Sequence, residues 1–79
     1  MAKLPVLKPK KVLEILLRAG FYIQHQTGSH IQLRHYQKSH LRVTIPYHTH
    51  FDLPSSVLKN ILKQAEVSKE EFLKLLRRT

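Results

Sequence analysis

The spacing of apolar residues changes twice along the chain and divides it into helices and strands. Apolar positions recur every three or four residues from Pro9 onward and stop at Gly20, which predicts a helix over residues 9–19. Glycine suits the end of this helix because it accepts a left-handed conformation. From Phe21 the apolar period falls to two, which predicts two strands joined by a turn at residues 27–29.

One further strand and two helices complete the pattern. Alternation over residues 40–45 predicts the third strand, and Pro46 ends it because proline has no N–H for the ladder. Helical spacing returns over residues 54–65, and the Ser-Lys-Glu-Glu run at residues 68–71 is a capping box for a last short helix. We therefore expect one α+β domain over residues 1–79, with a three-stranded antiparallel sheet backed by helices on one face.

The register of the second hairpin follows from parity and charge. The apolar residues of the two strands share the core face only when the numbers of opposed residues sum to an even value. Pairing Leu33 with Val43 would set Arg34 against Arg42, which is an unfavourable like-charge pair. We therefore predict that Leu33 pairs with Leu41.

The alternation also predicts a polar face on the sheet. In the first strand, Phe21 and Ile23 are expected to face the core, and Gln26 is expected to face the opposite side. The polar face of all three strands would gather Tyr22, Gln24, His30, Gln32, Arg34, Arg42 and Thr44.

Composition and charge narrow the class of partner. The chain has 79 residues, with 14 Lys and Arg against 5 Asp and Glu, and its net charge is +9. So one-sided a charge on a small protein favours nucleic acid first and an acidic protein second. Without cysteine there is no disulfide and no thiolate metal site. The apolar runs are far shorter than the roughly 20 residues that span a bilayer, so we expect a cytoplasmic protein without a membrane partner.

The triplet Gly28-Ser29-His30 offers chemistry at a defined place, the start of a strand. An imidazole can act as general acid or base near neutral pH, which is worth about 10²–10⁴-fold in rate. In RNA cleavage, a base removes the proton of the ribose 2′-hydroxyl and an acid protonates the leaving oxygen. Arg34 and Arg42 on the same face would stabilise the developing charge. The remaining expected substrate contacts are Gln32, His48, Lys10 and Lys11.

The triplet's smaller members suit phosphate contact. Gly28 lets the backbone approach a phosphate closely, and the Ser29 hydroxyl can donate a hydrogen bond. The competing interpretation of His30 is a polar residue on a solvated strand face.

A second group of histidines lies after the third strand. His48 and His50, with Asp52 nearby, have the spacing of metal ligands, but no further ligand completes a set, and we expect no metal or other cofactor. His48 can instead line the same cleft as His30. The other histidines are expected to be solvated residues at strand ends, without chemistry: His25, His35 and His40.

Five short motifs occur in order along the chain. They are Leu7-Lys8-Pro9-Lys10, Ala19-Gly20-Phe21, Gly28-Ser29-His30, Val43-Thr44-Ile45-Pro46 followed by His48, and Leu58-Lys59-Asn60-Ile61-Leu62-Lys63-Gln64-Ala65. With this set of motifs, the chain resembles the HicA toxin family from about Pro9 to Leu75.

The resemblance implies a double-stranded-RNA-binding-domain-like fold, αβββα, and an mRNA endonuclease that acts independently of translation. It also implies that His30 is the catalytic residue and that a HicB-type antitoxin neutralises the protein by covering the active site. Glu66 differs from the family pattern, because a glycine is common after the second helix.

Two alternatives share the same sequence features. The first is a non-catalytic module that binds double-stranded RNA through ribose and phosphate contacts. The second is a degenerate toxin that is kept only for binding its antitoxin. In each case the free protein is expected to be a monomer or a weak dimer.

Overall fold

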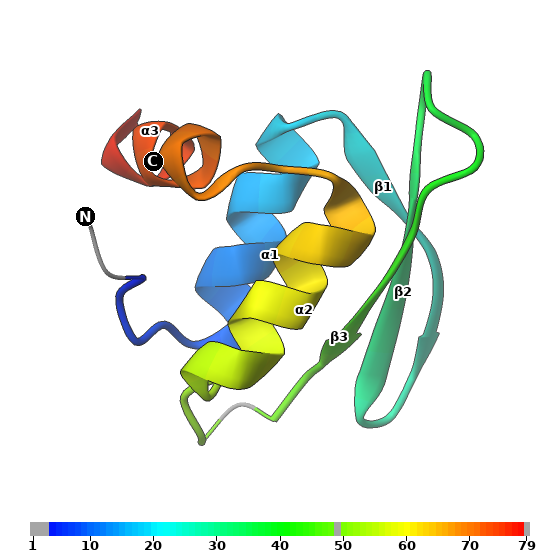
Figure 1. Cartoon of the computed structure of the whole chain (residues 1–79). Helices are drawn as coiled ribbons and strands as arrows, with labels where there is room; N and C mark the ends of the chain where they lie inside the picture. Colours follow the sequence, from blue (N-terminus) through cyan, green and yellow to red (C-terminus); the bar gives the residue numbers. More distant parts are fainter. Residues whose placement is uncertain (1–3, 49, 79) are drawn as a thin grey trace.

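The helices and strands follow one another in the predicted order (Figure 1). The computed structural model describes residues 4–48 and 50–78. The elements are α1 (Pro9–Arg18), β1 (Phe21–Thr27), β2 (His30–His35), β3 (Arg42–Pro46), α2 (Ser55–Ala65) and α3 (Lys69–Arg78). This order confirms the expected αβββα arrangement with a short C-terminal helix.

The molecule has a sheet layer and a helix layer. The strands form one antiparallel sheet in the order β1-β2-β3. Helices α1 and α2 cover one face of this sheet, and α3 packs against α1 on the side away from the strands (Figure 1). The other face of the sheet is not covered by any described element, and we call it the open face.

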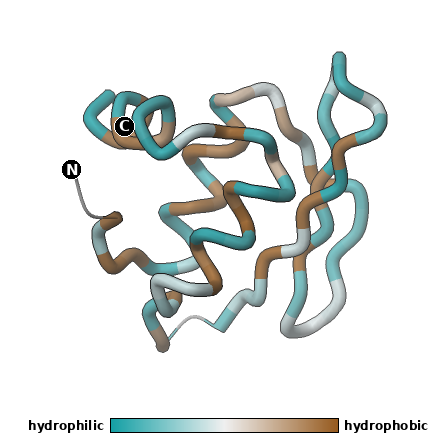
Figure 2. The backbone as a smooth tube through the Cα atoms, viewed as in Figure 1, coloured by the Kyte–Doolittle hydropathy of each residue, from teal (hydrophilic) through white to brown (hydrophobic). Residues whose placement is uncertain are grey.

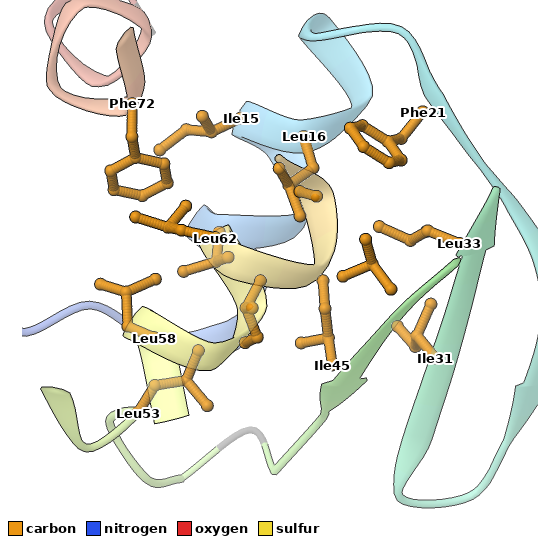
Figure 3. Close-up of a cluster of buried hydrophobic side chains, with 14 of the residues drawn as sticks. Ile15, Leu16, Phe21, Ile31, Leu33, Ile45, Leu53, Leu58, Leu62 and Phe72 are labelled. Atoms are coloured by element: carbon orange, nitrogen blue, oxygen red, sulfur yellow. The ribbon is translucent and has the colours of Figure 1, made fainter. Parts of the chain in front are cut away.

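A core of apolar side chains fills the space between the two layers, and Figure 3 shows it in close-up. Within the described residues, the buried hydrophobic side chains of this core are Val12, Ile15, Leu16, Phe21, Ile31, Leu33, Leu41, Val43, Ile45, Leu53, Leu58, Ile61, Leu62, Ala65 and Phe72. Phe72 is fully buried and attaches α3 to the helix layer. Figure 2 shows the hydrophobic positions along α1, α2 and the strands that face them. Burying these side chains is the main source of stability in a chain without disulfides.

Glycine is required where α1 passes into β1. Gly20 has a φ of 100°, a conformation that residues with a side chain rarely adopt. A Cβ at this position would lie 2.8 Å from Nε2 of His35. The predicted left-handed end of α1 is therefore confirmed, and the approach of His35 adds a second reason for glycine.

Helix α2 ends at a residue in the left-handed conformation, and helix α3 begins at the cap that the sequence predicted. Glu66 ends α2 in the left-handed conformation, with a φ of 56°, although it has a side chain. Ser68 Oγ accepts a hydrogen bond from the backbone N–H of Glu71 at 3.1 Å, so the predicted cap of α3 forms.

The predicted register of β2 and β3 is wrong. Leu33 lies opposite Val43, and Arg34 lies opposite Arg42. Leu41 is buried just before β3 rather than paired with Leu33. Both registers satisfy the parity of the core face, so only the arginine pair argued against the one that forms.

The like-charge pair is tolerated because its cost is small and partly offset. A cross-strand side-chain pair changes stability by only about 0.2–1 kcal/mol. Arg34 Nη2 donates a 2.7 Å hydrogen bond to the backbone carbonyl of Ser39, which draws this guanidinium toward the loop.

A β-bulge in β1 changes which side chains share a face. Ile23 pairs with Leu33, but the next pair is His25 with Gln32, so Gln24 is the extra residue. Beyond the bulge, Gln26 lies opposite the buried Ile31 and therefore on the helix side of the sheet, which corrects its predicted placement.

The bulge has two further effects. His25 and Thr27 are moved to the open face, where they lie opposite Gln32 and His30. Ile23 keeps its predicted side but is 42% exposed, so it does not belong to the core.

Candidate active site

His30 is the first residue of β2 and lies exposed on the open face of the sheet. It is paired with Thr27 of β1 and with Pro46 of β3, so strands support it on both sides. The tight turn at Gly28 and Ser29 precedes it directly. The rigid sheet therefore holds the imidazole at one end of a surface that a large substrate can reach.

Ser29 is in hydrogen-bond contact with the imidazole. Its Oγ lies 3.0 Å from Nδ1 of His30. A hydroxyl oxygen can accept a hydrogen bond from Nδ1–H whether or not Nε2 is protonated. In the other tautomer the hydroxyl donates to Nδ1, and in both cases Nε2 is the ring nitrogen that Ser29 does not contact.

Gly28 leaves open space at the turn. No atom lies within 4 Å of the place where a Cβ would stand, and its φ lies outside the left-handed region. The fold itself therefore does not require glycine here. A side chain would obstruct only a molecule that approaches the turn from outside.

The open face brings the expected polar residues together along β2 and β3. His30, Gln32 and Arg34 occupy alternate positions of β2, so all three side chains lie on this face. Gln32 and Arg34 border a hollow of about 120 Å³ together with Arg42 of β3. The hollow is also lined by Gln24, Leu33, Val43 and Thr44.

His25 is a further candidate for substrate contact, and the alternation in the sequence did not predict its place on the open face. It lies opposite Gln32 and diagonal to His30, because Thr27 lies opposite His30. Diagonal neighbours on one face are separated by about 7–8 Å. Only the bulge at Gln24 places it there, and a simple period of two does not show a bulge.

His48 does not share the open face with His30. It lines a cavity of about 430 Å³ whose other walls include Gly28 and Ser29. Gln26 also lines this cavity, and it belongs to the helix side of the sheet. His48 therefore lies on the helix-layer side of the turn at Gly28 and Ser29. The backbone N–H of Tyr47, the residue before it, still donates to the Ser29 carbonyl at 2.8 Å and so continues the ladder between β2 and β3.

Asp52 forms an ion pair with Lys8. Its Oδ1 lies 3.3 Å from Nζ of Lys8, and the backbone N–H of Leu53 donates to the carbonyl of Leu7 at 2.8 Å. These contacts fasten the connection between β3 and α2 to the segment before α1. Residues 4–48 and 50–78 contain no cluster of three metal-ligating side chains.

Lys10 and Lys11 lie in the first turn of α1, apart from the open face. They border a shallow hollow with Lys8, Glu14 and Asp52. This hollow belongs to the helix layer, at the end of the molecule where the turn before β2 also lies (Figure 1). The structure therefore does not bring the two lysines beside His30.

His35 is not the solvated strand-end residue that we expected. Its Nε2 lies 3.1 Å from the carbonyl oxygen of Ala19, and its Nδ1 accepts from the backbone N–H groups of Gln37 and Lys38 at 3.1 and 3.0 Å. Its ring also meets Phe21 edge-on, with centroids 4.7 Å apart. His35 is a structural residue that ties α1 to the loop after β2.

His40 is the third of the histidines that were expected to be solvated, and it agrees with that expectation. His40 is exposed, and its Nε2 lies 3.5 Å from Oε2 of Glu66. An ion pair at this degree of exposure contributes little to stability. His40 is therefore a suitable control position for substitutions of the histidines at the candidate site.

Comparison with known proteins agrees with the resemblance in the sequence. The family model described as the HicA toxin of bacterial toxin-antitoxin systems matches residues 9–67, which include the sheet, α1 and α2. Among curated proteins, none matches this sequence. No helix within the described residues is both long and apolar enough to cross a membrane. The chain belongs to the HicA toxin family, and it is therefore the toxin of a toxin-antitoxin system whose partner is an antitoxin.

Proposed function

We propose that this toxin is a metal-independent endoribonuclease that cleaves mRNA in the cytoplasm and arrests growth, with His30 as general acid or base. The observation that carries the proposal is the place of His30. It is exposed at the start of β2, and its Nδ1 is held by Ser29 Oγ at 3.0 Å. One nitrogen is thus oriented by the protein and the other is left for the substrate.

The proposed reaction forms one bond to phosphorus and breaks another. The ribose 2′-oxygen attacks the adjacent phosphorus, and the bond to the 5′-oxygen of the next nucleotide breaks. Nε2 of His30 either accepts the 2′-hydroxyl proton while water protonates the leaving 5′-oxygen, or donates a proton to the leaving 5′-oxygen while water accepts the 2′-hydroxyl proton. The products are a 2′,3′-cyclic phosphate and a 5′-hydroxyl end.

Neighbouring groups support the charge that develops on the phosphate. The Ser29 hydroxyl and the open backbone at Gly28 lie beside His30. Arg34 and Arg42 lie farther along the same face. Donors placed beside the reacting phosphate stabilise a transition state more than a ground state, whereas the two arginines lie too far along β2 to contact that phosphate and can bind only another part of the RNA.

The antitoxin is proposed to be an acidic HicB-type protein that covers this face. The net charge of +9 suits both an acidic protein and RNA. Such a partner would block access to His30 without changing the fold.

The deciding experiment compares His30→Ala with His40→Ala. Both changes remove an exposed histidine, but His40 pairs with Glu66 away from the proposed site. We expect His30→Ala to reduce RNA cleavage by about 10²–10⁴-fold and to relieve growth arrest, whereas His40→Ala should act like the parent.

RNA ends are mapped after brief expression and with purified protein, with and without EDTA. Undiminished cleavage by His30→Ala would refute the catalytic assignment. Loss of parent activity in EDTA would refute metal independence. RNA binding by the parent without new ends would favour the non-catalytic module.

A further inference from the structure

We propose that Arg34 and Arg42 together bind one internucleotide phosphate of a single RNA strand, at a linkage other than the one that is cut. This inference rests on the proposed function. Its starting point is that the two arginines are directly opposed on adjacent strands. Like charges in this position destabilise a sheet, so a bound anion would relieve a cost that the free protein bears.

The two arginine side chains come from a close pair of backbone positions. The backbone N–H of Thr44 donates to Gln64 Oε1 of α2 at 2.9 Å, so it points away from β2. Because the ladder alternates, Arg42, two residues earlier, also belongs to a non-hydrogen-bonded pair. In such pairs the Cα atoms are only about 4.5 Å apart and the side chains are closest.

No carboxylate among residues 4–48 and 50–78 forms an ion pair with either arginine. Within the described residues, the ion pairs join Lys8 to Asp52 and His40 to Glu66, and neither contains an arginine. Arg34 Nη2 is bonded to the Ser39 carbonyl, but Arg34 Nε is buried and has no hydrogen-bond partner among the described residues. A guanidinium with unused donors beside a second cation is a typical arrangement for phosphate recognition.

The hollow beside the pair has the size and the neutral donors for one phosphate group. Its volume is about 120 Å³, several times the roughly 30 Å³ that one water occupies in the liquid. Gln24, Gln32 and Thr44 line it, and their amide and hydroxyl groups can donate to phosphate oxygens. The flexible side chains of Gln24 and Gln32 let the hollow widen around a ligand.

The position along β2 separates this phosphate from the reacting one. Arg34 is four residues after His30 on the same strand and the same face, which corresponds to about 13 Å at 3.3 Å per residue. Both groups can therefore contact one strand of RNA, but not the same phosphate.

An aromatic pair beyond the arginines favours RNA over the antitoxin as the ligand. Tyr22 lies opposite Arg34, and its ring is 4.7 Å from that of Tyr36 between centroids. Tyr36 is 75% exposed, so a base can stack on it. A cationic site beside an exposed aromatic ring is the usual surface for single-stranded nucleic acid.

The test uses short single-stranded 2′-O-methyl RNAs, in which one linkage at a time is a neutral methylphosphonate. These probes have no 2′-hydroxyl nucleophile, so binding is measured without cleavage. We expect one linkage, away from the scissile position mapped with ordinary RNA, to weaken binding to the parent about tenfold when it is neutral. In Arg42→Gln, binding of the fully charged probe should fall by a similar factor, and the effect of that neutral linkage should disappear.

Lys59→Gln is the matched control, because it removes one exposed positive charge from α2. Arg34→Gln is a second test of the pair. Arg42→Gln should be at least as stable to heat as the parent, because it removes the repulsion. If Lys59→Gln weakens binding as much as Arg42→Gln, or if every linkage contributes equally, bulk charge explains the binding and the proposal fails.

Two further outcomes are decisive. If Arg42→Gln binds RNA normally but binds the purified antitoxin less well, the pair serves the protein partner and the proposal is wrong. Cleavage by the parent and by His30→Ala tests the proposed catalysis separately, because the methylphosphonate scan does not depend on cleavage.

Discussion

Ser29 Oγ lies 3.0 Å from Nδ1 of His30, and this contact leaves Nε2 as the imidazole nitrogen for the proposed proton transfer. Without the hydroxyl the ring is free to rotate, at a cost of roughly 1 kcal/mol of orientation. We therefore expect Ser29→Ala to reduce RNA cleavage about fivefold. Ser29→Thr keeps the hydroxyl and should restore most of the activity. Equal activity of the alanine and threonine variants would show that Ser29 does not position His30.

The glycines at the two ends of β1 should respond differently to alanine. Gly28→Ala is expected to change the free energy of unfolding by less than about 0.5 kcal/mol, because a Cβ meets no atom of the protein there. RNA cleavage should nevertheless fall, because the side chain would stand where a phosphate approaches. Unchanged cleavage would argue against contact with RNA at this turn.

Gly20→Ala serves as the contrasting variant. Its φ of 100° and the 2.8 Å approach of His35 Nε2 should together cost more than about 2 kcal/mol. Thermal unfolding should show the melting temperature falling by several degrees or more. A stable Gly20→Ala protein would contradict the geometry at the end of α1.

The location of His48 predicts a modest effect on catalysis. Because it lines the cavity behind the turn and not the open face, His48→Ala should reduce cleavage less than tenfold. The same assay on His30→Ala should show a loss of about 10²–10⁴-fold. A loss of that size in His48→Ala would instead make it the second proton-transfer residue.

His35 is expected to matter for stability and not for chemistry. His35→Ala removes the contact with the Ala19 carbonyl, two backbone hydrogen bonds and the edge contact with Phe21. Denaturant unfolding should show a loss of about 2–3 kcal/mol. His40→Ala should cost less than about 0.5 kcal/mol, since its ion pair is exposed.

Glu66 offers a stabilising change. The left-handed conformation of Glu66 costs roughly 1–2 kcal/mol. Glycine would remove this cost, but it would also make the unfolded chain more flexible, which cancels part of the gain in stability. Glu66→Gly should therefore raise the free energy of unfolding by about 0.5–1 kcal/mol and the melting temperature by a few degrees. Glu66→Ala, which keeps the strain and loses the ion pair with His40, should not be more stable than the parent.

Local signals were sufficient for the elements and for the place of His30. Proline at the start of α1, Gly20 at its end and Pro46 at the end of β3 act through their own backbone, so their effects can be predicted from neighbouring residues. The switch of apolar period at Phe21 likewise depends only on the adjacent sequence. Gly28 and Ser29 form the turn that was expected over residues 27–29, with Thr27 as the last residue of β1, and His30 begins the next strand.

The grouping of side chains across strands could not be predicted in the same way. The parity rule allowed a register in which Arg34 faces Arg42 and one in which it does not. A like-charge pair costs too little to exclude the first register, and the hydrogen bond from Arg34 to the Ser39 carbonyl was not visible in the sequence. The bulge at Gln24 moved His25 and Gln26 to opposite faces from those that strict alternation gives. Neither feature has a signal in the spacing of apolar residues.

By itself, the sequence determined the order of helices and strands, the apolar core and the position of the Gly28-Ser29-His30 turn, because these follow from local backbone preferences and hydrophobic period. Only the tertiary structure decided that two arginines meet on the open face, that His48 lies behind the turn, and that His35 holds the end of α1. The physical reason is that register and loop contacts depend on small energy differences between residues far apart in the chain. Packing of the whole molecule resolves those differences.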